Sequence, residues 1–202
     1  MANSDAASQQ SEINIQRQAV NNIQADTVTI QYGSAAEVKA NTVHISQAGA
    51  GQIEAQTVEL RQAGAQSIHG ASVTIRQGGA AQVQADQLSL IQGGIVFAST
   101  EQATLTASTV GTLLAGDQVT LDQSMAKAVI TRGDVTMEQS GTGLLLARNV
   151  HTGSNSGVIL MLAGRVDGEV NAVFGPAAGA AFGAVFAIVL GLILWLRRQV
   201  SG

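Results

Sequence analysis

A fifteen-residue phrase repeats along most of this chain, and the repeat limits the possible folds more than any other feature. Typical copies are INIQRQAVNNIQADT (13–27), VTIQYGSAAEVKANT (28–42) and VTIRQGGAAQVQADQ (73–87). Six consecutive copies keep one length, and the later copies, as far as residue 165, have fifteen or sixteen residues. Such a period predicts a structure in which each unit stacks on the next.

Inside each copy, apolar and polar residues alternate. Positions 1 and 3 are aliphatic, as in Val28 and Ile30, and positions 11 and 13 repeat the alternation, as in Val38 and Ala40. A period of two is typical of β-strands, and Gly-Ala pairs and Asn/Asp-Thr corners between the alternating stretches are typical of turns. A unit of two or three very short strands cannot bury its apolar side alone. We therefore predict an all-β fold, a parallel β-solenoid (β-helix) of about ten to eleven 15–16-residue coils, roughly 50 Å long at about 4.8 Å per layer.

The fifth position is often glutamine, and its side chains are expected to stack as an amide ladder along the solenoid. These glutamines are Gln47, Gln62, Gln77, Gln92, Gln123 and Gln139.

The two ends of the chain differ from the repeat. Residues 1–12 are polar and read as a disordered tail, and the solenoid is expected over 13–175. The run AAGAAFGAVFAIVLGLILWL (177–196) holds twenty residues without a charge, which spans about 30 Å as a helix, the thickness of a bilayer core. We predict a single-pass transmembrane α-helix over 176–196, followed by a short basic tail over 197–202.

Small residues recur every four positions through this segment, a spacing that lets two membrane helices approach closely. They are Gly175, Gly179, Gly183, Ala187 and Gly191. No secretory signal precedes the repeat, which favours a tail-anchored protein with a cytoplasmic solenoid. Arg197 and Arg198 would by themselves place the short tail in the cytoplasm.

One outer face of the predicted solenoid changes character halfway along the chain. Positions 10 and 12 are polar in the first five copies, as in Glu37 and Lys39, and become largely apolar from the sixth copy onward. An apolar face of this size requires cover, by another copy of the chain, by a different protein or by lipid. The predicted association residues are Phe97, Leu114, Ile130, Leu144, Leu146, Ile159 and Met161.

The chain is poor in chemistry-bearing residues. Charged residues make up 12% and aromatic residues 3%, the formal net charge is −4, and there is no cysteine, so the sequence argues against nucleic-acid binding and thiolate metal sites. The three histidines are scattered, and the stacked pair Asp122 and Glu138 lacks a surrounding cleft or aromatic platform. We expect no enzyme activity and no catalytic, cofactor-binding or metal site. Loss of an activity on mutating Asp122 or Glu138 would be needed to argue for an enzyme.

The short V-x-I strands, the Gly/Ala turns and the small uniform core resemble those of the bactofilins, over roughly residues 13–170, with AGRVDGEV (163–170) as a loose match to their glycine-flanked motifs. The resemblance implies non-enzymatic polymerisation by end-to-end stacking of solenoids, often at a membrane. It assigns no individual residue a role.

Two functions therefore remain open from the sequence. The first is a membrane-anchored structural scaffold that forms a homo-oligomer or filament through the apolar outer face and the small-residue stripe of the anchor. The second is a binding module or accessory subunit whose apolar face docks another membrane protein or complex.

Overall fold

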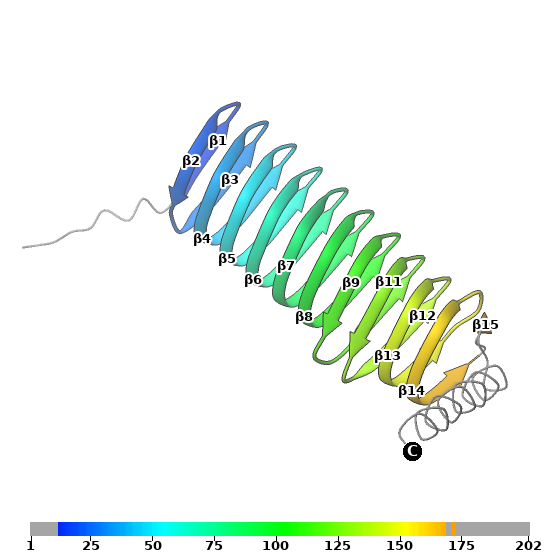
Figure 1. The fold of residues 1–202 in the computed structure, drawn as a ribbon. Coiled ribbons are helices and arrows are strands. Elements are labelled where there is room, and N and C mark those ends of the chain that lie inside the picture. The colour runs from blue at the N-terminus through cyan, green and yellow to red at the C-terminus, as the bar shows by residue number, and fades with distance from the viewer. Residues whose placement is uncertain (1–11, 169–170, 173–202) are drawn as a thin grey trace, which may run out of the picture.

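The computed structural model describes residues 12–168 and 171–172, which form a parallel β-solenoid of about ten coils (Figure 1). All strand pairings within this part of the chain are parallel and belong to one continuous sheet that winds around the core. The strands are β1 (Glu12–Gln16), β2 (Ala19–Gln24), β3 (Thr27–Gln31), β4 (Ser34–Ser46), β5 (Gly49–Arg61), β6 (Gly64–Arg76), β7 (Gly79–Ile91), β8 (Gly94–Thr106), β9 (Thr109–Ala115), β10 (Val119–Asp122), β11 (Met125–Thr131), β12 (Asp134–Glu138), β13 (Gly141–Thr152), β14 (Gly157–Gly168) and β15 (Asn171–Ala172).

Strands β4 to β8 are longer than the sequence pattern predicts. Each contains thirteen residues and continues around one bend of the coil, where the pattern suggested separate, very short strands. The reason is that pairing with the next coil persists on both sides of the bend: Ala40 pairs with Ala55, and Thr42 pairs with Thr57. A ladder that is not interrupted at the bend keeps the backbone groups there satisfied.

The register between coils is fifteen residues in the first half and mostly sixteen in the second. Thr100 pairs with Ala115, but Ala103 pairs with Val119, so the first extra residue lies within the bend 116–118. A later extra residue lies in the turn 153–156, between the pairs Met137–Thr152 and Gly141–Gly157. Length changes thus fall in bends and turns, and the strands keep their inward and outward alternation.

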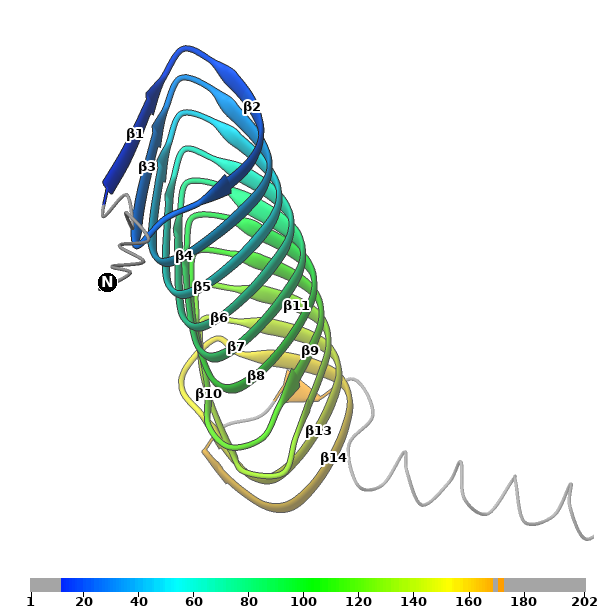
Figure 2. The same cartoon turned by 90° about the vertical axis from the view of Figure 1, so that its left-hand side faces the viewer.

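The core is a set of columns that run along the rod, because equivalent inward residues of successive coils lie above one another. Figure 2 shows the coils as stacked, flattened loops around this narrow interior. Positions 3 and 11 each form a fully buried column. The position-3 column includes Leu60, Ile75, Leu90, Leu105 and Leu121. The position-11 column includes Ile53, Ile68, Val83, Leu113 and Val129. Each buried Leu, Ile or Val contributes roughly 1.5–3 kcal/mol relative to exposure.

The corner after position 4 has an unusual backbone in every coil. Ten residues other than glycine have positive φ angles, between 47° and 61°, and they occupy the fifth position: Arg17, Tyr32, Gln47, Gln62, Gln77, Gln92, Ala107, Gln123, Gln139 and Asn155. The left-handed conformation costs a residue with a side chain roughly 1–2 kcal/mol.

Side-chain amides offset part of this cost in the first half of the rod. The amide of Gln47 donates to Gln62 at 2.8 Å, Gln62 donates to Gln77 at 3.2 Å, and Gln77 donates to Gln92 at 3.3 Å. The predicted amide ladder is therefore confirmed across these four coils. It ends at Ala107, which has no amide to continue it.

In the second half, a ladder of buried serines follows the same corner, which the sequence analysis did not predict. The backbone N–H groups of Gly93, Ser108 and Ser124 donate to the hydroxyl oxygen of the serine one coil further on, at 3.1–3.2 Å. Each hydroxyl in turn donates to a backbone carbonyl two residues earlier, as Ser124 does to Asp122 at 2.8 Å. These bonds satisfy polar groups that the narrow coil buries.

The predicted transmembrane segment (176–196), with its small-residue stripe, and most of the polar tail lie outside the described residues. Within the described part of the chain, no helix is long and apolar enough to cross a membrane.

We predict that Gln77→Ala lowers the free energy of unfolding by about 1–2 kcal/mol, because it removes two amide hydrogen bonds and keeps the strained backbone. Gln77→Gly should cost less than Gln77→Ala, since glycine adopts positive φ without penalty. Urea denaturation followed by circular dichroism measures both. An equal or larger loss for glycine would show that backbone strain at this corner is negligible.

Candidate functional site

Positions 10 and 12 form two adjacent columns on one outer face of the rod. They flank the buried position 11, so their side chains point away from the core. Side chains of the two columns contact each other within one coil: Lys39 lies 3.1 Å from Glu37, and the amide of Gln52 donates to Glu54 at 3.3 Å. We call this surface the two-column face.

The first half of the two-column face is polar. Its members from coil 1 to coil 5 are Asn22 and Gln24, Glu37 and Lys39, Gln52 and Glu54, Ser67 and His69, and Gln82 and Gln84. Lys39 also lies 3.3 Å from Glu54 of the next coil. Hydrogen bonds from the Lys39 ammonium raise the pKa of Lys39, and the bond to Glu37 contributes more than the bond to Glu54.

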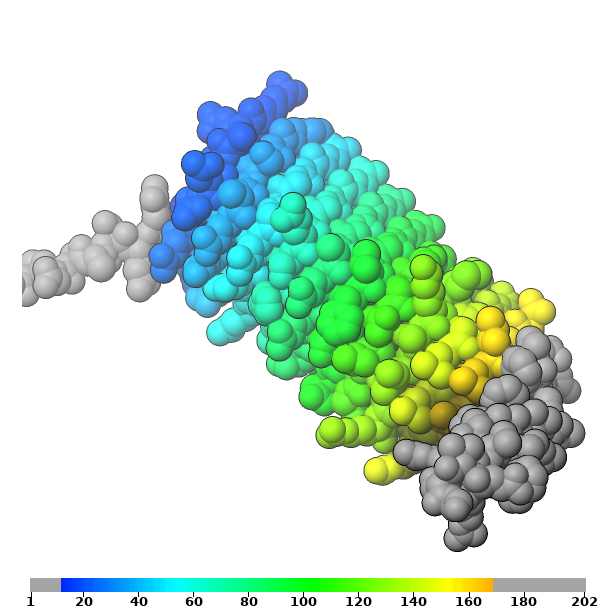
Figure 3. All heavy atoms as spheres, in the orientation of Figure 1, coloured from blue at the N-terminus to red at the C-terminus, as the bar shows by residue number. Residues whose placement is uncertain are grey.

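The second half of the two-column face is largely apolar. Strand pairing stacks Leu114, Ile130, Leu146 and Leu162 in the position-12 column, and the position-10 column holds Phe97, Leu144 and Leu160. We call these seven residues the apolar stripe. The remaining members of the two columns here are Ser99, Thr112 and Ala128. Five layers at about 4.8 Å give the apolar stripe a height of roughly 24 Å. In the orientation of Figure 3, side chains form continuous rows along the rod, and no deep hollow interrupts the coloured, described part of that surface.

Exposure along the apolar stripe increases toward the C-terminal coil. Phe97, Leu114, Ile130 and Leu144 are half-buried. The exposed fractions are 41% for Leu146, 47% for Leu160 and 58% for Leu162. The stripe is therefore most open to contact in coils 9 and 10.

The structure corrects the predicted register of the last coil. Met161 pairs with the fully buried Leu145 and packs against the core, so it does not belong to the outer face. Ile159 is 54% exposed, but it lies beside the two columns, at position 9. Leu160 and Leu162 take the outward places that the sequence analysis gave to Ile159 and Met161.

The error came from the placement of the extra residue in coil 10. Aligning SGTGLLLA (140–147) with SGVILMLA (156–163) puts the additional residue in the turn before Ser156 and pairs Leu144 with Leu160. The serine shared by these two segments is the signal that identifies the correct register.

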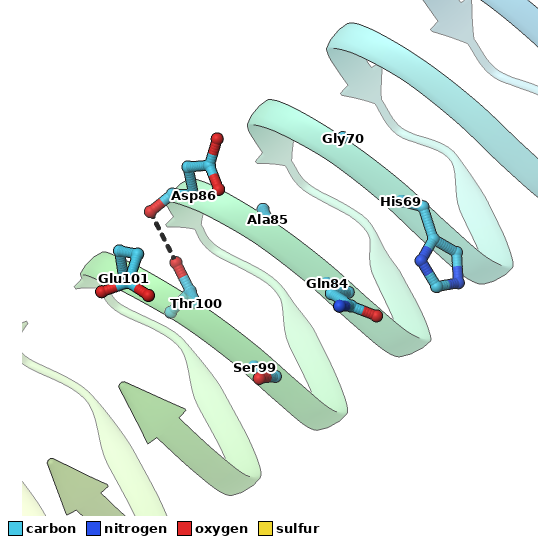
Figure 4. A pocket seen from close by; sticks show the side chains of 8 residues that line it. All are labelled: His69, Gly70, Gln84, Ala85, Asp86, Ser99, Thr100 and Glu101. Atoms are coloured by element: carbon cyan, nitrogen blue, oxygen red, sulfur yellow. Dashed lines mark hydrogen bonds between the residues drawn. The ribbon is translucent and has the colours of Figure 1, made fainter. Parts of the chain in front are cut away.

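One group of potentially reactive side chains lines an open hollow at the bend of coils 4 to 6 (Figure 4). Figure 4 shows His69, Gln84 and Ser99 on successive coils, with Asp86 and Glu101 at the bend. Thr100 donates to the backbone carbonyl of Asp86 at 3.0 Å. Among the described hydrogen bonds, none joins His69 to Ser99 or to either carboxylate, so the arrangement has no nucleophile–base pair.

A second polar cluster lies on the opposite face, at positions 2 and 4. Arg61 donates to Glu59 at 2.7 and 2.8 Å, and His44 lies 3.2 Å from the same carboxylate. The hydrogen bond from Arg61 lowers the pKa of Glu59, partial burial opposes it, and His44 acts in the same direction as Arg61. This is an ordinary surface ion pair, which contributes at most about 1 kcal/mol.

The remaining acidic pair considered above, Asp122 and Glu138, does lie in adjacent coils in register. Neither residue lines the hollow at the bend of coils 4 to 6. Over residues 12–168 and 171–172, no group of three or more His, Cys, Asp or Glu side chains is placed to hold a metal ion.

Comparison with known proteins identifies no relative. No family model matches the chain, and neither a curated protein nor a solved structure does so. The likeness to the bactofilins thus remains one of repeat pattern.

We predict that Arg61→Gln raises the pKa of Glu59 toward its ordinary value of 4.5. Because the folded pKa is depressed, the pair stabilises the fold above the unfolded pKa, and this contribution is lost as pH falls through the folded pKa. NMR titration of the Glu59 carboxyl carbon measures the change. Arg76→Gln is the matched control, since Arg76 pairs with Arg61 in the next coil and belongs to no described ion pair. A Glu59 titration that responds to Arg76→Gln alone would contradict the assignment.

Proposed function

We propose that this protein is a non-enzymatic, membrane-anchored structural scaffold that self-associates through the apolar stripe. The observation that supports this most is the alignment of seven apolar side chains in two outer columns over five consecutive coils. Isolated apolar residues are normal on protein surfaces, but a continuous apolar patch usually marks an interaction site.

A second copy of the chain is the occupant that we favour. Lipid contact commonly uses Trp, Tyr, Lys or Arg at the headgroup level, and the stripe itself contains only Phe, Leu and Ile. A rod that stands upright on its anchor holds the stripe above the bilayer surface.

The membrane anchor in this proposal is the apolar segment 176–196, with the solenoid on the cytoplasmic side. Its small residues at 175, 179, 183, 187 and 191 provide a second surface for association in lipid. Attachment to one membrane raises the effective concentration of solenoids, so that a modest contact through the stripe suffices for assembly.

The scaffold role rests on the repetition itself. Successive coils supply the same narrow core and the same left-handed corner. This is the pattern expected when length and side-to-side contact matter more than a single reactive site.

We predict that the double variant Leu144→Asp with Leu146→Asp abolishes association and leaves the solenoid folded, because both side chains point outward. Light scattering of the full-length chain in detergent gives the mass, and circular dichroism monitors folding. The control Ser89→Asp with Ile91→Asp places the same charges on the opposite face of coil 6 and should keep the wild-type mass. An unfolded Leu144/Leu146 variant would contradict the outward placement.

The alternative function is a binding module whose apolar stripe docks a different membrane protein or complex. The same light-scattering measurement separates the two. If both the wild-type chain and the Leu144→Asp/Leu146→Asp variant are monomeric, the result would favour the binding module.

A further inference from the structure

When two copies of the chain are placed with their two-column faces toward each other, the side-chain sizes and charges are complementary in only one of the two orientations that we compare, parallel and antiparallel. We infer that two copies pair in parallel, face to face, about a two-fold axis that runs along the rod. This inference rests on the proposed self-association and adds its geometry.

The symmetry decides which residues meet. A two-fold axis along the rod keeps equivalent coils at one height and places position 10 of one copy opposite position 12 of the other. An antiparallel pair that overlaps the two stripes would instead place position 10 opposite position 10, and coil 6 opposite coil 10.

Side-chain sizes in coils 6 to 8 favour the parallel arrangement. Each of these coils carries one large and one small residue on the two-column face: Phe97 with Ser99, Leu114 with Thr112, and Ile130 with Ala128. In a parallel pair, every large residue faces the small residue of the partner's coil. In the antiparallel pair, Leu114 faces Leu146 and Ala128 faces Ala128, which leaves a protrusion in one layer beside a gap in the next.

The last two coils are compatible with the same pairing. Leu144 and Leu146 form one layer, and Leu160 and Leu162 form the next. A parallel pair brings four leucines together in each of these layers, where exposure is greatest. Burial there contributes the most, since hydrophobic stabilisation scales with the area removed from water.

Charges in the first half select the same orientation. Glu37 at position 10 of coil 2 would face Lys39 at position 12 of the partner, and the reciprocal contact follows from symmetry. In coil 3, the amide of Gln52 would face the carboxylate of Glu54. An antiparallel pair centred on the stripes leaves all these groups without a facing partner.

The interface would then extend along the whole two-column face. Ten layers at about 4.8 Å and a width of roughly 10–14 Å give roughly 500–700 Å² per copy. This approaches the ~800 Å² per partner of a standard interface, which the apolar stripe alone does not reach.

Single cysteines test the geometry directly, because the chain has none of its own. Two differently tagged full-length copies are co-expressed, solubilised in detergent and treated with a short bis-maleimide. Ser99→Cys is combined either with Phe97→Cys or with Leu162→Cys. A parallel pair places Ser99 opposite the partner's Phe97, and about 19 Å along the rod from the partner's Leu162. An antiparallel pair places Ser99 opposite the partner's Leu162, and about 19 Å along the rod from the partner's Phe97.

We expect the Ser99/Phe97 combination to cross-link most of the heterodimers that are present, and the Ser99/Leu162 combination to stay at the background level. The background is set by Ser89→Cys with Thr104→Cys on the opposite face. Preferential linking of Ser99 with Leu162 overturns the parallel pairing but keeps self-association. If neither combination cross-links, the parallel pairing is also overturned, and light scattering of the same samples then tests self-association. A monomeric mass would overturn the proposed function as well. An oligomeric mass would keep self-association but show that it uses another surface.

A charge exchange gives an independent test of the parallel pairing. Lys39→Glu places like charges opposite one another and should reduce the linked Ser99/Phe97 heterodimer, and the combined Glu37→Lys with Lys39→Glu should restore it. No loss with Lys39→Glu, or a loss that the exchange does not restore, argues against facing contacts in coil 2.

Discussion

Backbone hydrogen bonds between successive coils hold each residue directly above its counterpart, and the rest of the structure depends on this register. The bonds continue even through the strained corner, where the N–H of Gln62 donates to the carbonyl of Arg76 at 2.9 Å and that of Gln77 donates to Ile91 at 2.9 Å. Because the register is kept, a residue type that recurs once per coil becomes a column. The aliphatic core, the glutamine ladder, the serine ladder and the two-column face are all columns of this kind.

The columns explain why so much of the architecture follows from the sequence. A fixed repeat length with alternation at positions 1, 3 and 11 is sufficient to predict stacking, core and outer face. The amide ladder follows in part: it joins Gln47, Gln62, Gln77 and Gln92, whereas none of the described hydrogen bonds joins the side chains of Gln123 and Gln139. The repeat pattern does not show which residue of a bend or turn is the additional one when a coil is longer than its neighbour. The residue added before Ser156 moves Leu160 and Leu162 outward, and only the alignment of the neighbouring serines reveals it.

The serine ladder was missed for a different physical reason. Ser108, Ser124 and Ser140 lie at a corner between strands, and a serine in a turn is normally solvent-exposed. Here the narrow coil buries the hydroxyl, and its value lies in satisfying the backbone N–H of the previous coil. That role becomes visible only when the depth of the corner is known.

In the parallel pairing that we propose, the two halves of the two-column face have different roles. Contacts among leucines near the C-terminal end contribute affinity, because they remove apolar area from water. Polar contacts farther from that end contribute orientation, because a facing charge of the wrong sign costs more than a correct pair gains. A surface that changes from polar to apolar along one axis can thereby be weak in every coil and selective as a whole.

The confinement of length changes to bends has a consequence for how such a molecule varies. A coil is a unit of fifteen or sixteen residues that meets its neighbours only through its two edges. Gain or loss of one coil in the polar half would change the reach of the rod by about 4.8 Å and leave the apolar stripe intact. The length of the rod is thus adjustable in whole-coil steps, independently of the surface through which we propose that copies associate.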